Sequence, residues 1–91
     1  MNEELLLLSV KVDLGISTNV YDERLRSRLR TAQARIRAEG VTLGDTEEDR
    51  DLVIMYAAWL WRYRQTSEDM PRMLRYALNN RILAQKASAG A

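Results

Sequence analysis

The chain has 91 residues, of which 46% are hydrophobic and 30% charged, and a formal net charge of +1; these values describe one globular domain without bulk attraction to nucleic acid. It contains neither cysteine nor histidine, which excludes disulfides and argues against a structural zinc site. Because a chain this short buries only about 60–65% of the surface that its unfolded form exposes, a single copy is expected to be marginally stable, and oligomerisation is the remaining way to stabilise it.

Residues 3–14 are predicted to form the first helix. Leu7, Val10 and Leu14 follow helical spacing, acidic residues occupy the first turn, and the glycine that follows is placed to cap the C-terminal end. Val10, Val12 and Leu14 also alternate as they would in a β-strand, so a strand remains the alternative.

The second helix is predicted to begin at Asn19, whose side chain is suited to cap it, with Asp22 three residues later placed to accept from the exposed amides. Its apolar residues form one narrow stripe: Tyr21, Leu25, Leu29, Ala32 and Ile36. Two rows of arginine flank this stripe, Arg24, Arg28 and Arg35 on one side and Arg26, Arg30 and Arg37 on the other. These rows are expected to extend over the apolar stripe and to pair with the carboxylates of residues 45–51.

The third helix is predicted to begin at Asp45 or Thr46 and to run to about Gln65. Ten successive apolar residues follow its acidic first turn and sweep its whole circumference, so this helix is expected to be buried all round. Three other helices are too few to cover both Trp59 and Trp61, and the surplus apolar surface is expected to meet another chain. The alternative is that the two indoles cap the core of a single subunit.

The last helix is predicted to begin between Asp69 and Pro71, since proline is tolerated in a first turn. Its inner face consists of Met70, Leu74, Ala77 and Leu78. Arg81 lies near the middle of this inner face, and Tyr76 and Leu83 lie on the opposite side, which indicates a second contact surface. Alternatively, Arg81 extends to solvent at the edge of the domain and Tyr76 is incidentally exposed.

Taken together, these elements predict an all-α protein, a small bundle of about four helices. Residues 1–86 are expected to form a single helical domain. Beyond Leu83 the composition turns to alanine, serine, glycine, glutamine and lysine without periodicity, so residues 87–91 are expected to form a flexible C-terminal tail.

The charges are segregated along the chain. Residues 1–18 and 45–51 are net acidic, whereas residues 20–40 and the residues from 62 onward are net basic. Segments of opposite sign can pair within one fold or between neighbouring copies, and a ring of identical subunits would use both kinds of contact.

Residue patterns typical of catalysis or metal binding are missing from the sequence. Without histidine or cysteine, a nucleophile lacks its usual base. The acidic residues at 45–51 lack the spacing and turn glycine of a calcium loop, and neither Gly40 nor Gly44 precedes the lysine and hydroxyl residue of a phosphate-binding loop. The sequence therefore predicts a protein that is not an enzyme, with no catalytic residue, no cofactor and no metal site.

The arginines of residues 20–40 are also suited to contact DNA phosphates. Against this interpretation, they lie on two flanks of a helix instead of one face, and no helix-turn-helix or zinc-finger signature accompanies them. DNA recognition therefore stays as an alternative function.

Residues 70–81 read MPRMLRYALNNR and are preceded at residues 55–62 by MYAAWLWR. The upstream positions that fit the same pattern are Val10, Lys11, Leu14, Gly15, Ile16, Asn19, Asp22, Ala32, Ile36 and Gly40. In these segments the chain resembles the head-tail connector, or adaptor, family of tailed phages and prophages. The resemblance covers most of the chain, and its last third is the distinctive part.

The resemblance implies a subunit that docks as a dodecameric ring on the portal protein, extends the DNA channel and joins the head to the head-completion or tail-completion protein. DNA would pass through the channel without sequence-specific recognition, and no membrane would be involved. The protein would be found at the head-tail interface of the virion, and in the host cytoplasm during assembly. The alternative is a DNA-binding helical protein of the packaging module, similar to a small terminase subunit.

Surplus apolar surface and the resemblance together indicate which residues contact a neighbouring subunit or the portal: Trp59, Trp61, Tyr63, Arg72, Arg75, Tyr76, Asn79, Asn80 and Arg81. The residues expected to make electrostatic contacts with acidic segments across the seam are Arg24, Arg26, Arg28, Arg30, Arg35 and Arg37. In a closed ring, one face of each subunit meets a different face of its neighbour.

Overall fold

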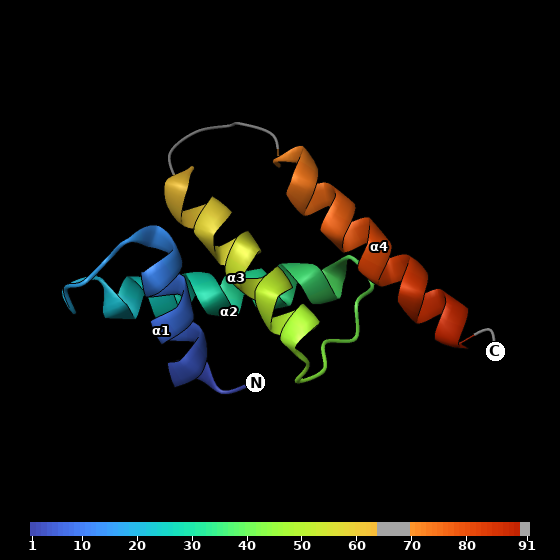
Figure 1. Cartoon of the computed structure of the whole chain (residues 1–91), viewed down its shortest axis with the longest axis horizontal. Coiled ribbons are helices and arrows are strands. Elements are labelled where there is room, and N and C mark those ends of the chain that lie inside the picture. Colours follow the sequence, from blue (N-terminus) through green and yellow to red (C-terminus); the bar gives the residue numbers. More distant parts are fainter. Residues whose placement is uncertain (64–69, 90–91) are drawn as a thin grey trace.

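Four α-helices account for most of the chain in the computed structural model, which describes residues 1–63 and 70–89 (Figure 1). The helices are α1 (Glu3–Leu14), α2 (Asp22–Ala38), α3 (Glu47–Arg62) and α4 (Arg72–Ala89). No strand occurs among these described residues, so the prediction of an all-α protein with about four helices is confirmed.

The first helix begins and ends where the sequence predicts. The side-chain oxygen of Asn2 accepts hydrogen bonds from the backbone N–H groups of Glu4 (3.0 Å) and Leu5 (3.2 Å), which caps the N-terminus. At the other end Gly15 adopts a φ of 71°, and the N–H of the next residue donates to the carbonyl of Lys11 at 2.9 Å. The helix is confirmed, and the strand alternative is wrong.

The second helix begins later than predicted. It starts at Asp22 after Tyr21, whose side chain makes no capping hydrogen bond, and the predicted cap Asn19 lies in the preceding loop. The ammonium group of Lys11 on α1 instead donates to the Asn19 side-chain oxygen and to the Asp22 carboxylate, both at 2.9 Å. The predicted cap is wrong because a charged partner on another helix engages both of the candidate capping groups.

The third helix begins as predicted, but it is not buried all round. The Thr46 hydroxyl caps it by accepting from the backbone N–H three residues later at 3.2 Å. Asp51, Met55 and Arg62 are exposed along one line of the helix, because α1, α2 and α4 pack on its other sides and leave this one open. The predicted end at Gln65 lies outside the described residues.

The fourth helix begins at Arg72, one residue after the predicted start between Asp69 and Pro71. Of that predicted region, Asp69 lies outside the described residues. It continues to Ala89, so residues 87–89, which the sequence analysis assigned to the C-terminal tail, belong to the helix. Alanine, serine and lysine are all tolerated in a helix, and the next glycine in the chain comes only at residue 90.

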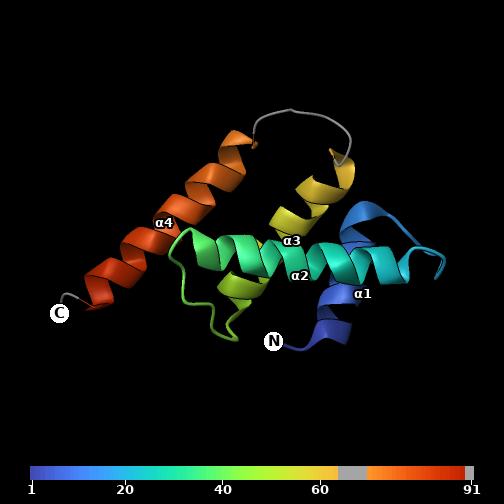
Figure 2. The same cartoon turned by 180° about the vertical axis from the view of Figure 1, so that it is seen from behind.

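The core lies where α1, α2 and α3 meet, and α4 covers one side of α3 (Figures 1 and 2). Most of the predicted α2 stripe is fully buried, but Tyr21 at its start is 40% exposed. The buried apolar residues are Leu6, Leu7, Val10, Leu25, Leu29, Ala32, Ile36, Val41, Leu52, Val53, Tyr56, Ala57, Ala58, Leu74 and Leu78.

The molecule is elongated, with extents of 46 × 29 × 18 Å along its principal axes. Seen from the front and from behind, α1 lies toward one end of the longest axis and α4 extends to the other (Figures 1 and 2). Within the described part of the chain, no helix combines the length and the apolar character needed to cross a lipid bilayer.

Candidate interaction surface

The outer face of α4 exposes several of the predicted interface residues: Arg72, Tyr76, Asn79 and Asn80. Met73, Tyr76 and Leu83 are 72%, 54% and 63% exposed and follow helical spacing with Asn80 between them. We call Met73, Tyr76, Asn80 and Leu83 the α4 stripe. Since Leu78 on the other face lies in the core, α4 has one apolar face inside the subunit and a second one open to solvent.

The two tryptophans pack partly within the subunit. Trp59 and Trp61 are half-buried against the core, and each meets a tyrosine edge-to-face. The ring centroids of Trp59 and Tyr56 are 5.5 Å apart, and those of Trp61 and Tyr21 are 5.6 Å apart. These contacts match the alternative in which the indoles cover the core of one subunit. Tyr63, another of the predicted interface residues, lies exposed at the end of α3.

Arg81 joins α4 to the start of α3 through a buried ion pair. Its Nε donates to Asp49 Oδ1 at 2.6 Å, and its Nη2 donates to Asp49 Oδ2 at 3.2 Å and to the carbonyl of Thr42 at 2.9 Å. Asp49 is 1% exposed. The hydrogen bond from Arg81 lowers the pKa of Asp49 against the opposing effect of burial, with a further contribution from the Gly44 N–H at 2.8 Å. The structure therefore places the Arg81 guanidinium on an internal partner.

Further polar contacts tie α4 to the loop before α3 and to the end of α2. Gln85 donates to the carbonyl of Gly40 at 2.8 Å and accepts from the N–H of Thr42 at 2.7 Å. Arg75 pairs with Glu39 at 3.3 Å, so this predicted interface residue also has an internal partner. We call Thr42, Asp49, Arg81 and Gln85 the polar clamp.

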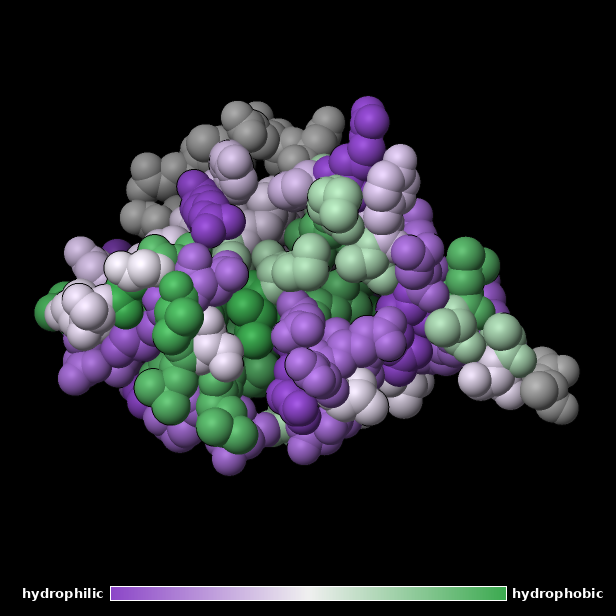
Figure 3. All heavy atoms as spheres, viewed as in Figure 1, coloured by the Kyte–Doolittle hydropathy of each residue, from purple (hydrophilic) through white to green (hydrophobic). Residues whose placement is uncertain are grey.

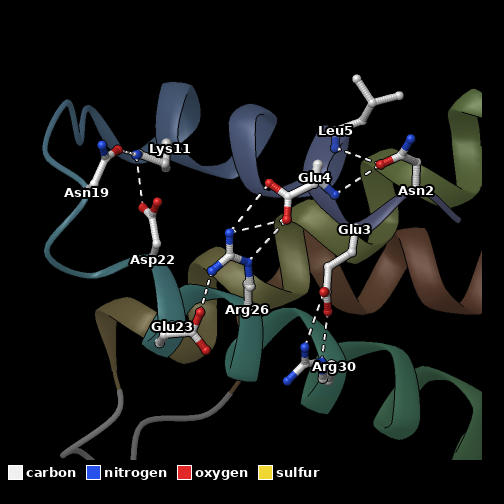
Figure 4. Close-up of polar contacts among 10 residues, drawn as sticks. All are labelled: Asn2, Glu3, Glu4, Leu5, Lys11, Asn19, Asp22, Glu23, Arg26 and Arg30. Carbon is white, nitrogen blue, oxygen red and sulfur yellow. Dashed lines mark hydrogen bonds and ion pairs between the residues drawn. The ribbon is translucent and has the colours of Figure 1, made fainter.

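The two arginine rows of α2 differ in their partners. Arg26 hydrogen-bonds to Glu4 of α1 at 3.3 Å, and Arg30 binds Glu3 through two hydrogen bonds at 2.8 and 3.1 Å (Figure 4). The prediction that these rows pair with residues 45–51 is wrong. Helix α1 lies along the flank of α2 that contains Arg26 and Arg30, so its carboxylates are the partners of these two arginines. In the described part of the chain, the arginines of α2 that form no ion pair are Arg24, Arg28, Arg35 and Arg37.

The first helix has an exposed apolar face that the sequence analysis missed. Leu5, Leu8 and Val12 are 55%, 60% and 82% exposed and lie on one line of α1. Figure 3 shows hydrophobic surface over α1, and in Figure 4 the Leu5 side chain points away from the ion pairs with α2. The four consecutive leucines at residues 5–8 were the available signal, because they place apolar groups on opposite sides of a helix. We call Leu5, Leu8 and Val12 the α1 stripe.

A groove between α3 and α4 combines an apolar floor with an acidic rim. The floor consists of Leu52, Met55 and Ala77, and the rim includes Glu47, Glu48 and Asp51. Within residues 1–63 and 70–89, no three potential metal ligands come together to hold an ion. The acidic rim favours a cationic or apolar neighbour over a phosphate.

Comparison of the chain with protein family models, with the curated proteins and with the solved structures finds no match.

Proposed function

We propose that the protein is a structural subunit of a phage head-tail connector. Copies assemble as a ring on the portal protein, extend the DNA channel and offer their far surface to the next head-completion or tail-completion protein. The resemblance of residues 55–62 and 70–81 to the connector family supports a head-tail connector as the assembly that this subunit forms. The exposed apolar residues of α4 supply a surface for it.

The α4 stripe is the observation that supports this proposal most directly. Met73, Tyr76 and Leu83 are each more than half exposed on a helix whose opposite face places Leu74 and Leu78 in the core. Tyrosine and methionine are enriched in protein interfaces relative to other surfaces. A helix with two apolar faces, of which the subunit covers one, is suited to a protein neighbour on the other.

The polar clamp strengthens this argument because it fixes the orientation of the stripe. Arg81 and Gln85 hold the second half of α4 against the loop before α3 and the first turn of α3, through five hydrogen bonds to Thr42, Asp49 and Gly40. A surface that is already ordered before binding loses less conformational entropy in the complex. The clamp thus prepares α4 for docking as a rigid element.

A second candidate function, DNA binding in the packaging module, is favoured by one observation. Arg24, Arg28 and Arg35 follow one another along a single flank of α2, and no described carboxylate pairs with them. Such a row of cations is suited to contact phosphates. The formal net charge of +1 nevertheless gives the whole chain little attraction for a polyanion.

Imaging a mixture of the purified chain and the portal protein from the same phage genome tests the proposal. The connector predicts a ring of additional density at one end of the portal, formed without DNA. Tyr76→Ser should reduce ring formation while leaving the fold intact, because the Tyr76 side chain is 54% exposed. Val20→Ser, at a position 80% exposed in the loop before α2, is the matched control and should assemble normally.

Salt dependence separates the two candidate functions. A DNA-binding protein retains duplex DNA at low salt and releases it steeply toward physiological salt, as counterion release requires. Arg28→Gln should then weaken retention, with Arg62→Gln on α3 as the control. Salt-dependent retention of duplex together with no ring on the portal would overturn the connector in favour of the DNA-binding protein.

A further inference from the structure

We infer that the α1 stripe of one subunit packs on the α4 stripe of the next, so that copies of this chain associate head to tail. The residues of the contact are Leu5, Leu8 and Val12 on one side and Met73, Tyr76, Asn80 and Leu83 on the other. The closure of these contacts into a ring rests on the proposed function, whereas the pairing of the two stripes follows from the subunit alone.

Both stripes have the dimensions of a helix–helix contact. The α1 stripe follows the spacing i, i+3, i+7, and the α4 stripe continues it to i+10. At about 1.5 Å of rise per residue, the α1 stripe is about 10 Å long and the α4 stripe about 15 Å. Alternating spacings of three and four residues form the seam along which two helices pack against each other. The six apolar side chains of the stripes are between 54% and 82% exposed, so the subunit itself leaves both rows open.

The position of the stripes decides how copies pair. The helices α1 and α4 lie toward opposite ends of the 46 Å axis (Figures 1 and 2). A dimer formed through one stripe packed on itself would leave the other stripe exposed on both copies. A contact between unlike stripes covers both kinds, and each added subunit brings one free stripe for the next. Repetition of this heterologous contact builds the ring that a connector requires.

The charges of the two helices favour the same pairing. Helix α1 contains three carboxylates and one lysine, and α4 contains four cations and no carboxylate. Among the residues that the structure describes, Asp13 on α1 and both Arg72 and Lys86 on α4 form no ion pair. Opposite charge attracts α1 to α4, and like charge disfavours α1 against α1 or α4 against α4.

The absence of cysteine from the sequence allows a cross-linking test without background. Tagged Leu8→Cys protein is mixed with untagged Tyr76→Cys protein, at high concentration and on the portal, and then oxidised. The inference predicts a severalfold excess of tagged–untagged disulfides over the products of either variant with itself, because a disulfide forms only between close Cβ atoms. A mixture of Leu8→Cys with Val20→Cys, at an exposed loop position, is the matched control.

A double variant, Leu8→Cys with Tyr76→Cys, tests the head-to-tail order. Head-to-tail association predicts a ladder of covalent multimers on a denaturing gel. A pair of copies that exchanges both contacts with each other would stop at covalent dimers and overturn this order. Excess self-linked products, or mixed products no more abundant than those of the Val20→Cys control, would overturn the pairing of the stripes itself.

Portal binding distinguishes failure of this inference from failure of the proposed function. If rings form on the portal while Leu8→Cys and Tyr76→Cys remain unlinked, or if Leu8→Cys links to the portal instead, the connector stands and the contact between the stripes is wrong. If the two variants link and no ring forms on the portal, the contact stands and the connector assignment falls.

Discussion

Apolar side chains join α1, α2 and α3, whereas α4 is attached by a narrow apolar contact and the polar clamp. Leu29 at the centre of the three-helix part is 0% exposed, and among the described residues of α4 only Leu74 and Leu78 are buried apolar residues. Beyond Leu78, Ile82 packs partly buried against the core, and Arg81 and Gln85 attach α4 to the loop before α3 and to the first turn of α3. Apolar burial is non-directional, whereas charged hydrogen bonds fix an orientation. The three-helix part therefore supplies most of the stability of the fold, and the polar clamp fixes the orientation of α4.

This comparison predicts the largest loss of stability for truncation of Leu29, the central leucine of α2. Leu29→Ala should lower the free energy of unfolding by about 2–5 kcal/mol, because the side chain is fully buried and its removal leaves a cavity. Urea unfolding followed by far-ultraviolet circular dichroism measures this loss. Leu83→Ala, at a position 63% exposed on α4, is the control and should cost less than about 0.5 kcal/mol. Equal costs for the two variants would contradict the assignment of stability to the three-helix part.

Removal of the charge in the polar clamp should have the next largest effect. Asp49→Asn keeps the shape of the side chain but leaves the Arg81 guanidinium, 18% exposed, without its carboxylate partner. The expected cost is about 2 kcal/mol in the free energy of unfolding. Amide hydrogen exchange should show the larger loss of protection in α4 than in α2. Asp45→Asn, whose pair with Arg50 is exposed, is the control and should cost less than about 0.5 kcal/mol.

The dependence on pH tests the same ion pair. The hydrogen bond from Arg81 lowers the pKa of Asp49 in the folded chain, while an unfolded aspartate has a pKa of about 3.9. Stabilisation by such a carboxylate is fully present above the unfolded pKa and is lost as the pH falls through the folded pKa. The stability difference between the unaltered chain and Asp49→Asn should therefore stay constant above about pH 5 and shrink below about pH 4. A difference that stays unchanged as the pH falls from about 5 to about 3 would contradict the lowered pKa of Asp49.

Helix ends were predictable where their signals are local. Gly15 and Thr46 stop and start helices through bonds to backbone groups only a few residues away. The start of α2 was not predictable in this way, because Lys11 on α1 engages Asn19 and Asp22. That contact depends on how two helices pack, which the spacing of residues along one helix does not determine.

The same distinction between local signals and packing between helices explains which parts of the candidate surface were predictable. Periodicity along α4 placed Tyr76 on its outer side, as the structure has it. The partner of Arg81 was not predictable, because Asp49 lies 32 residues earlier and reaches it only through the packing of α4 on α3. The α1 stripe was missed although Leu5 and Leu8 are visible in the sequence, because a run of leucines does not show which of its members the core will cover.

A surface ion pair between α1 and α2 provides the smallest expected effect and the sharpest contrast with the clamp. Arg30 and Glu3 bind each other with side chains 62% and 35% exposed, so Arg30→Gln should cost less than about 0.5 kcal/mol at low salt and less still at high salt. Urea unfolding at two salt concentrations measures this, with Arg24→Gln as the control, since no described carboxylate pairs with Arg24. If Arg30→Gln cost as much as Asp49→Asn, an exposed ion pair would hold α1 to α2 as firmly as the buried one holds α4. Apolar burial alone would then no longer account for the stability of the three-helix part.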